Sequence, residues 1–241
     1  MKAVEPYYRR CFSPVKRWNS VEPLAVKAAL QEALERWGRP TSIRVDNGTP
    51  WGSNGSVPSA LALWLAGLGV EVIYGRPARS TDNAVIERCN GVMAQWVEPE
   101  RQPDFATCQE RLDWAGWTQR ERYRSRHHYT RAEAYPNLYT NPRTYGRQQD
   151  AQLWQVERAA SFLSHYRFQR QVEKNGRITL LANTYSVGRA FARQLVTVQL
   201  DWQTQEWVVC DDYGNEIRRH PSKELDYTLI SNLQLAKRRK G

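Results

Sequence analysis

The segment Ser42-Ile43-Arg44-Val45-Asp46-Asn47-Gly48 is the most informative one for the expected fold of this chain. It predicts a short β-strand that ends at an acidic residue, followed by a turn in which Asn and Gly supply left-handed backbone geometry. Before it, Pro23 to Trp37 has apolar residues at three- and four-residue steps and is followed by Gly38, which predicts an amphipathic helix. After it, Val70 to Tyr74 predicts a second strand.

Three more helices are expected in the first half of the chain. One runs from about Pro58 to Leu68 with Ser56 as its N-cap, a second carries Glu87, and a third spans about Asp104 to Arg122. A basic turn, Gly75-Arg76-Pro77-Ala78-Arg79-Ser80, precedes the helix with Glu87. Helices that alternate with strands over short loops favour an α/β layered architecture.

The last third of the chain has the pattern of an all-β module. Short apolar strands alternate with turns such as Lys174-Asn175-Gly176. Several short strands at this spacing predict a small barrel or sandwich. The expected strands are residues 177–181, 185–187, 195–200 and 206–210.

Composition limits the classes of function. The 241 residues carry a formal net charge of +10, so we expect a polyanionic partner such as nucleic acid. The longest apolar run, Ala60 to Leu68, is about half of the roughly 20 residues that a membrane span needs, so we expect no membrane contact. The four cysteines form no Cys-x-x-Cys pair and follow no secretory signal, which favours a cytoplasmic protein without a structural zinc site.

Residues 116–147 combine positive charge with aromatic rings. They hold seven arginines against Glu121 and Glu133, interleaved with one tryptophan and five tyrosines. Arginines contact phosphates and aromatic rings supply stacking surfaces, which is typical of a nucleic-acid groove. A second interpretation is a solvated, irregular connector whose tyrosines cover the core. The candidate DNA contacts are Arg120, Arg122, Arg124 and Arg126, together with the C-terminal residues Lys237, Arg238, Arg239 and Lys240.

Asp46 and Glu87 are the candidate catalytic residues. Two Mg²⁺ ions about 4 Å apart can catalyse in-line phosphoryl transfer on DNA, and magnesium demands oxygen ligands such as carboxylates. Taken alone, Asp46-Asn47-Gly48 is most often a turn, and Glu87 beside Arg88 is most often a surface residue. The residues around the two acids therefore decide whether a catalytic or a purely structural role is expected for them.

Those residues resemble the catalytic core of the DDE polynucleotidyl transferases, the superfamily of retroviral integrases and bacterial insertion-sequence transposases with an RNase H-like fold. Glu35 to Pro40 and Ile43 to Trp51 are similar to the helix-to-strand passage that carries the family's second catalytic Asp. Leu63 to Val70, Gly75-Arg76-Pro77 and Glu87-Arg88 are similar to the passage from that Asp to the final Glu. The strength of the resemblance lies in the ordered combination.

The resemblance implies an α/β, RNase H-like integrase core, incomplete at its N-terminus, followed by a small all-β barrel that Tyr185 to Val198 resembles. It implies that Asp46 and Glu87 bind metal in a two-ion Mg²⁺ or Mn²⁺ site. It also implies DNA as the substrate and a homo-oligomer that works on DNA in the bacterial cytoplasm, at the nucleoid. The expected domains are the core at 1–120, a basic aromatic-rich arm at 121–165, the barrel at 166–230 and a basic tail at 231–241.

The chain departs from the family's pattern at two places. Family members often carry Gln-Thr-Gly-Lys-like residues before the final Glu, whereas this chain has Thr81-Asp82-Asn83-Ala84-Val85. We therefore expect Arg76, Arg79 or Arg88 to replace that lysine near the DNA phosphate. The family's first Asp lies on a strand well before the helix that begins at Pro23, and no Asp precedes that helix, so we expect an incomplete active site.

Three functions stay open on the sequence. The first is a working transposase or integrase that cuts element ends and joins the 3′-hydroxyl to target DNA. The second is a truncated transposase that keeps DNA binding and lacks catalysis. The third is a protein-interaction module in which Asp46 and Glu87 are only turn and surface residues. The first predicts metal-dependent strand transfer. The second predicts DNA binding without strand transfer, and the third predicts no DNA binding at low salt.

Overall fold

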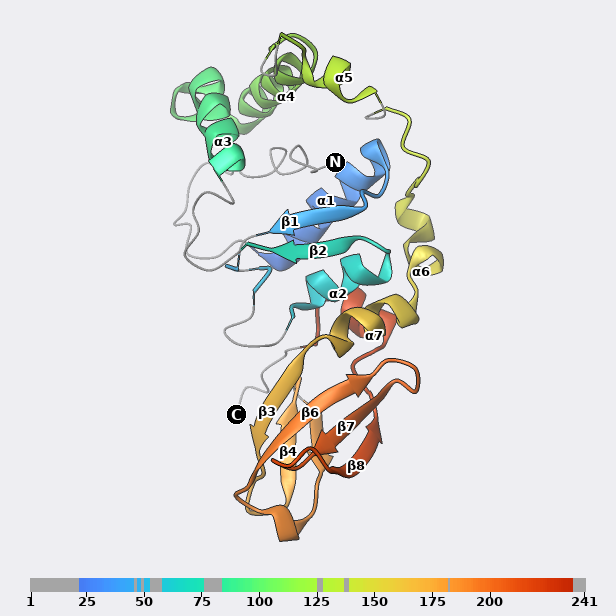
Figure 1. Ribbon diagram of the computed structural model, residues 1–241. Coiled ribbons are helices and arrows are strands. Elements are labelled where there is room, and N and C mark those ends of the chain that lie inside the picture. Colours follow the sequence, from blue (N-terminus) through green and yellow to red (C-terminus); the bar gives the residue numbers. More distant parts are fainter. Residues whose placement is uncertain are drawn as a thin grey trace. The chain divides into compact units, whose positions relative to one another are not determined.

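A computed structural model describes most of the chain, which is a mixed α/β protein (Figure 1). It divides into two compact units, the first formed by Met1–Asn47 with Ile73–Gln149 and the second by Gly48–Val72 with Asp150–Gly241. The mixed α/β class expected from the sequence is therefore confirmed. The described residues are 22–45, 47–48, 50–52, 58–75, 84–124, 128–136, 139–181 and 183–235, with the side chains of 84–86 and 105 left out.

The first unit is built mainly from helices. Its first helix begins at Pro23, whose fixed φ suits a first helical turn, and ends at Gly38, whose φ is +71° and whose N–H donates to the Leu34 carbonyl. A Cβ at Gly38 would lie 2.8 Å from the Arg143 carbonyl oxygen, so only glycine fits. The elements of this unit are α1 (Pro23–Trp37), β1 (Ser42–Val45), α3 (Ala84–Val97), η3 (Pro99–Arg101), α4 (Phe105–Glu121), α5 (Arg131–Ala134) and η5 (Arg147–Gln149).

Helices α3 and α4 share an apolar core, with Trp96 packed against it. The carboxylate of Asp104 caps α4 by accepting a hydrogen bond of 2.8 Å from the N–H of Thr107. That hydrogen bond holds the pKa of Asp104 below its ordinary value. The buried core residues are Met93, Val97, Cys108, Leu112 and Ala115.

A small sheet joins β1 to β2 (Glu71–Tyr74), and the two arrows point the same way in Figure 1. Parallel neighbours need a crossover connection, and α2 (Ala60–Gly67) provides it. Ile43 and Val45 are buried on alternate positions of β1. The two strands expected from the sequence are therefore present, and β1 ends one residue before Asp46.

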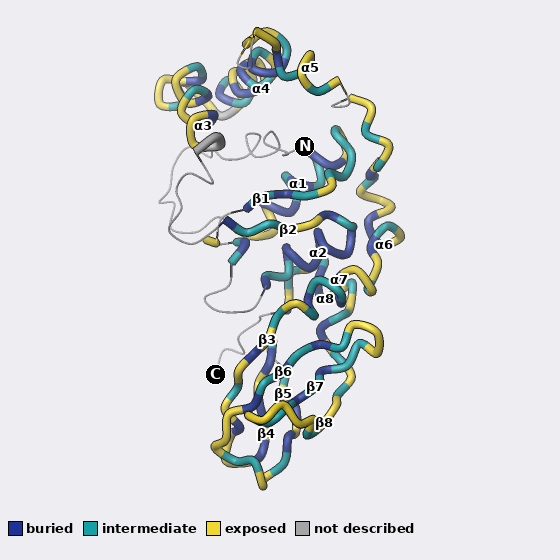
Figure 2. Tube along the Cα trace, viewed as in Figure 1, coloured by how far each residue is buried: buried dark blue, intermediate teal, exposed yellow. Residues whose placement is uncertain are grey.

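The second unit holds the most apolar of the described helices, α2. Every residue from Leu61 to Leu68 is buried (Figure 2), as expected of a helix that is apolar on all sides. The hydroxyl of Ser59 caps α2 by accepting a hydrogen bond from the N–H of Ala62, and the expected cap Ser56 lies outside the described residues. The other helices of this unit are α6 (Asp150–Leu153), α7 (Val156–Ser164) and α8 (Tyr227–Ser231).

Specific polar and steric contacts fix α2 in this unit. The indole N–H of Trp64 donates to Asp150 at 3.0 Å, and the hydroxyl of Tyr227 donates to the same carboxylate at 3.0 Å. A Cβ at Gly67 would lie 1.9 Å from the indole nitrogen of Trp154. The buried carboxylate of Asp150 thus joins α6 to α2 and to α8, which lie far apart in the sequence.

The β-rich part of the second unit contains an antiparallel four-stranded sheet in the order β3-β6-β7-β8 and a separate β4-β5 hairpin. Buried residues alternate with less buried ones along β6 and β7, so one face of the sheet forms the core. The described strands do not close into a hydrogen-bonded ring, and the small barrel stays a proposal. The strands are β3 (Arg167–Gln171), β4 (Arg177–Leu180), β5 (Asn183–Ser186), β6 (Leu195–Asp201), β7 (Glu206–Cys210) and β8 (Glu216–Pro221).

One buried carboxylate holds the hairpin to the sheet. Glu224 is 0% exposed and accepts hydrogen bonds from the hydroxyl of Tyr185 at 2.8 Å and from the indole of Trp207 at 2.9 Å. The side chains of Asn183 and Ser222 donate to it as well, at 2.9 and 3.0 Å. Because a buried carboxylate is costly unless it is well hydrogen-bonded, these donors are what make its position in the core stable.

Within the described part of the chain, no helix combines the length and the apolar character that crossing a membrane requires.

Candidate nucleic-acid and metal site

Hydrogen bonds join the residues at the carboxyl ends of β1 and β2. The backbone N–H of Gly75, which follows β2, donates to the carbonyl oxygen of Val45 at 2.9 Å. The side-chain amide of Asn47 donates to the carbonyl oxygen of Gly75 at 2.9 Å. The residues on both sides of Asp46 are therefore bonded to Gly75, whereas Asp46 itself lies outside the described residues.

Glu87, the second candidate ligand, lies in the first turn of α3. Its side chain and that of Arg88 are exposed, so both can reach a partner in solution. A negative charge in a first turn is favoured by the helix dipole. The other two cations predicted near this site, Arg76 and Arg79, lie outside the described residues.

Arg120 is the one predicted DNA contact that the fold buries among those described, with 6% exposure. Its Nε donates to the carboxylate of Glu121 and to the hydroxyl of Tyr139, both at 2.8 Å. Its guanidinium also lies over the ring of Trp37, 4.9 Å from the ring centre. Arg120 therefore links α4 to α1.

Electrostatics support this linking role. The hydroxyl of Tyr139 donates to Glu121, and this hydrogen bond, more than the neighbouring Arg120, lowers the pKa of Glu121. Burial and the same hydrogen bond raise the pKa of Tyr139. Both groups thus keep their ordinary charge states at neutral pH, carboxylate and phenol, and the network around Arg120 is stable there.

Arg122 and Arg124 are exposed, as a phosphate contact requires. The guanidinium of Arg122 lies 5.4 Å from the ring centre of Trp117, and 43% of Trp117 is exposed. Tyr129 is 60% exposed, whereas Tyr145 is buried at 6%. Residues 116–147 therefore show features of both interpretations, because they include an exposed arginine–aromatic surface as well as a ring that is buried in the core. Arg126, Lys237, Arg238, Arg239 and Lys240 lie outside the described residues.

A cavity of about 290 Å³ lies beside this network, between α1, α3 and α4 of the first unit. Its lining combines the apolar residues Met93 and Leu112 with the rings of Trp37 and Trp117. This volume is near the lower limit of small-molecule sites. The contact of Trp37 with Arg120 joins residues far apart in the chain, so no local sequence pattern predicts it.

The described residues contain no group of three or more His, Cys, Asp or Glu side chains that could hold a metal ion. Asp46, one of the two predicted ligands, lies outside the described residues. Carboxylates remain the ligand type that fits Mg²⁺. No protein-family model matches this sequence.

Proposed function

We propose that this chain is a metal-dependent polynucleotidyl transferase of the transposase and integrase type, with an RNase H-like core and a small β-barrel, that cuts and joins DNA. Asp46 and Glu87 are its proposed Mg²⁺ or Mn²⁺ ligands, two of the three acids that the resemblance implies, so we expect strand cutting by this chain alone to be weak. The observation that carries the proposal is the pair of hydrogen bonds that ties the residues flanking Asp46, Val45 and Asn47, to Gly75. Gly75 opens the segment that leads to Glu87.

The arrangement of strands supports this assignment. In open α/β sheets, ligands bind at the carboxyl ends of neighbouring parallel strands. Asp46 follows the carboxyl end of β1, and the chain leaves the carboxyl end of β2 towards the exposed Glu87. Asp46 directly follows β1 and Glu87 comes 13 positions after the last residue of β2, so the chain connects both candidate ligands to the same edge of the β1-β2 sheet.

The chemistry required of the residues is simple. Two carboxylates supply hard oxygen ligands, and a bound divalent ion would activate the attacking oxygen and stabilise the departing one. The exposed Arg88 beside Glu87 is suited to holding a DNA phosphate. The exposed Arg122 and Trp117 supply a cation and a ring to a DNA strand.

A plasmid-nicking assay tests the proposal without knowledge of the element ends. The full chain is incubated with supercoiled plasmid and Mn²⁺ or Mg²⁺, and conversion to open-circular and joined products is measured. We expect Asp46→Asn and Glu87→Gln each to reduce nicking by more than about 100-fold, since even residues that only support metal ligands often cost 10- to 100-fold. Equal nicking by the two variants and the wild type would overturn the proposal.

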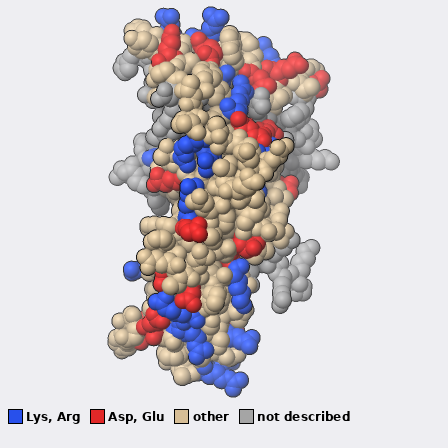
Figure 3. Space-filling view, turned by 90° about the vertical axis from the view of Figure 1, so that its right-hand side faces the viewer, with Lys and Arg blue, Asp and Glu red and all other residues tan. Residues whose placement is uncertain are grey.

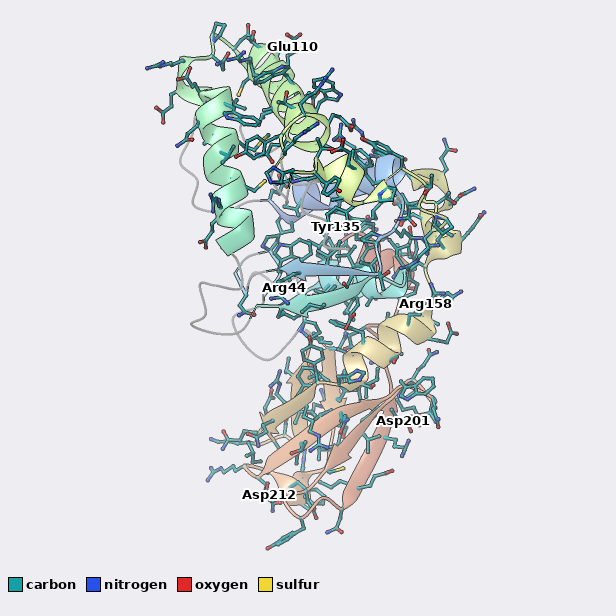
Figure 4. The ribbon with its side chains drawn as sticks, turned by 45° about the horizontal axis from the view of Figure 1, so that its top comes forward. Arg44, Glu110, Tyr135, Arg158, Asp201 and Asp212 are labelled. Carbon is teal, nitrogen blue, oxygen red and sulfur yellow. The ribbon has the colours of Figure 1, made fainter. Side chains whose placement is uncertain are left out.

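Glu110→Gln is the matched control, because Glu110 is an exposed carboxylate on α4 and is labelled in Figure 4. It should nick plasmid as the wild type does. DNA binding with no metal-dependent nicking in the wild type would instead identify a protein that only binds DNA. Failure to bind DNA at low salt would favour the protein-interaction module.

A further inference from the structure

The cavity of about 290 Å³ in the first unit contains neither of the proposed metal ligands. Helix faces enclose it, because Leu112, Gly116 and Arg120 line it at four-residue steps along α4, and residues 29, 33 and 37 do so along α1. Leu112 also belongs to the apolar core that α3 and α4 share. The walls are therefore packed helices, and the cavity is preformed.

Gln119 is a buried polar side chain in the lining of this cavity, with 3% exposure. Its side-chain oxygen accepts a hydrogen bond from the thiol of Cys89 at 3.1 Å. The sulfur of Cys89 accepts in turn from a guanidinium N–H of Arg131 at 3.4 Å, so its single hydrogen is directed to Gln119. These two bonds orient the amide, with its oxygen toward Cys89 and its NH₂ group away from it.

Part of the hydrogen-bonding capacity of Gln119 is unused. A side-chain amide has two N–H donors and an oxygen with two lone pairs. Cys89 uses one lone pair, and the described residues give the NH₂ group no partner. A buried polar group without a partner costs free energy, so a ligand that bonds to it is favoured. Gln119 thus presents a donor and an acceptor side by side.

The charges of the side chains around the cavity cancel. Glu121 pairs with Arg120 at 2.8 Å, which leaves two cations and two acids in the lining. A charged ligand would therefore find no net opposite charge to compensate its loss of hydration, so a neutral ligand is favoured. The charged residues of the lining are Arg36, Arg120, Arg131, Glu32 and Asp113.

The helices around the cavity carry mixed charge as well. Together α3 and α4 contain three arginines and four acids. Figure 3 shows basic and acidic side chains interspersed over the upper end of the molecule, where these helices lie in Figure 1. A long polyanion is attracted by a field of one sign. The surroundings thus favour a small ligand that is held inside the cavity.

We propose that this cavity binds a small, flat, neutral aromatic amide, either a ring carboxamide or a lactam. The carbonyl oxygen of the ligand accepts from the NH₂ group of Gln119, and its N–H donates to the free lone pair of the Gln119 oxygen. Side-chain amides pair in the same two-bonded way with the donor and acceptor edge of adenine. The ring packs against Met93 and Leu112. The volume, near the lower limit of small-molecule sites, suits one or two fused rings.

Isothermal titration calorimetry with the full chain in EDTA tests the proposal. The probe is isoquinolone, a two-ring lactam, and we expect a dissociation constant below about 1 mM. Isoquinoline has the same rings without the carbonyl and the N–H, so it should bind about tenfold or more weakly because two hydrogen bonds are lost. Naphthoate also has two rings but carries a negative charge, and it too should bind more weakly than isoquinolone.

Two matched glycine variants test the place of binding. A Cβ at Gly116 in α4 or at Gly91 in α3 would meet nothing within 4 Å, but only Gly116 lines the cavity. Gly116→Leu should fill the cavity and weaken isoquinolone binding by about tenfold or more, whereas Gly91→Leu should bind as the wild type does. Circular dichroism checks that both variants are folded. Equal affinities of the two variants would overturn the proposal.

Gln119→Leu tests the amide pairing. It removes the donor and the acceptor together, so this variant should bind isoquinolone and isoquinoline with equal affinity. Three results with the wild type would overturn the proposal: no binding of isoquinolone, equal binding of isoquinolone and isoquinoline, or tighter binding of naphthoate.

The outcome is separable from that of the nicking assay, because the calorimetry contains neither metal nor DNA. A chain that fails to nick plasmid but prefers isoquinolone over isoquinoline keeps the cavity as an amide-binding site. A chain that nicks plasmid and does not bind isoquinolone loses it.

Discussion

At the scale of single residues, the burial of Glu224 is the observation with the clearest energetic consequence. Its carboxylate lies in the core without exposure and accepts hydrogen bonds from Tyr185, Trp207 and Ser222. In the sequence, Ser222-Lys223-Glu224 is an ordinary polar segment, and nothing in its pattern separates it from a surface turn. Its partners come from other strands, so only the folded chain identifies it.

Replacing Glu224 by Gln should destabilise the second unit by about 3 kcal/mol, because a hydrogen bond to a charged group is worth about 1.5–3 kcal/mol. The NH₂ group of the new amide would also face the O–H and N–H groups that now donate to the carboxylate, and two donors cannot bond to each other. Urea unfolding followed by tryptophan fluorescence measures the change. Glu157→Gln, at an exposed position of α7, should stay within about 0.5 kcal/mol of the wild type. Equal stability of the two variants would contradict this role for Glu224.

Two tyrosines, the buried Tyr185 and the half-buried Tyr227, predict a loss of stability in alkali. Burial, followed by the charge of Asp150, raises the pKa of Tyr227 from 10.0 to about 12. Burial, followed by the charge of Glu224, also raises the pKa of Tyr185. Because folding favours the protonated phenol, this stability is fully present below pH 10 and is lost as the pH rises through the folded-state pKa values.

The free energy of unfolding should therefore fall as the pH rises from about 10 to about 12. Urea unfolding across this range measures it. Tyr227→Phe removes one titrating group and should make the fall shallower, whereas Tyr213→Phe, at a position that is 91% exposed, should leave it unchanged. A pH dependence that is identical in wild type and Tyr227→Phe would contradict the assignment to Tyr227.

Among the helices and strands, the element whose ends are marked by proline and glycine was predicted most accurately. The helix predicted from Pro23 to Trp37 has those bounds in the structure, since both ends are set by residues with special backbone preferences. The strands β3 and β8 and the helix α7 were not predicted as separate elements. β8 is rich in charged residues, because it lies at the edge of the sheet and is held there by backbone hydrogen bonds, so it lacks the apolar pattern of a strand. The buried face of α7 consists mainly of Ala159, Ala160 and Leu163, which form a weak apolar pattern.

Two helical glycines should respond to alanine in opposite ways. A Cβ at Gly67 would lie 1.9 Å from the indole of Trp154, whereas a Cβ at Gly91 in α3 would meet nothing within 4 Å. Gly67→Ala should cost about 1–3 kcal/mol through overpacking, and Gly91→Ala should stabilise its helix by about 0.5–1 kcal/mol. Thermal unfolding followed by circular dichroism compares them. A stabilising Gly67→Ala would contradict the close packing of α2 against Trp154.

At the scale of the whole molecule, metal binding should be visible as stability. If Asp46 and Glu87 hold Mg²⁺ in the folded state, a concentration a hundred times the dissociation constant stabilises the protein by about 2.7 kcal/mol. Calorimetry should show an unfolding midpoint that rises with Mg²⁺ and returns with EDTA. Asp46→Asn should abolish the rise, while Glu110→Gln should keep it. A rise that persists in Asp46→Asn would place the ion elsewhere.

Three features could be predicted from the sequence: the alternation of helices and strands, the strand that precedes Asp46, and the excess of positive charge. These features depend on residues close together in the chain, where periodicity, proline and glycine act directly on the backbone. The candidate ligands Asp46 and Glu87 were also identified in the sequence, because the residues around them resemble a known family. Their roles stay predictions.

Which charged residues are exposed and which are paired within the protein depends on the fold and could not be predicted from the sequence. Arg120 and Arg122 look alike in the sequence, but Arg120 is buried against Tyr139 and Trp37, whereas Arg122 is exposed. Arg219 is surrounded by acids, whereas Arg189 faces solvent without a partner. The physical reason is that an ion pair forms only when the fold brings opposite charges within a few ångströms, and those partners come from distant positions in the chain.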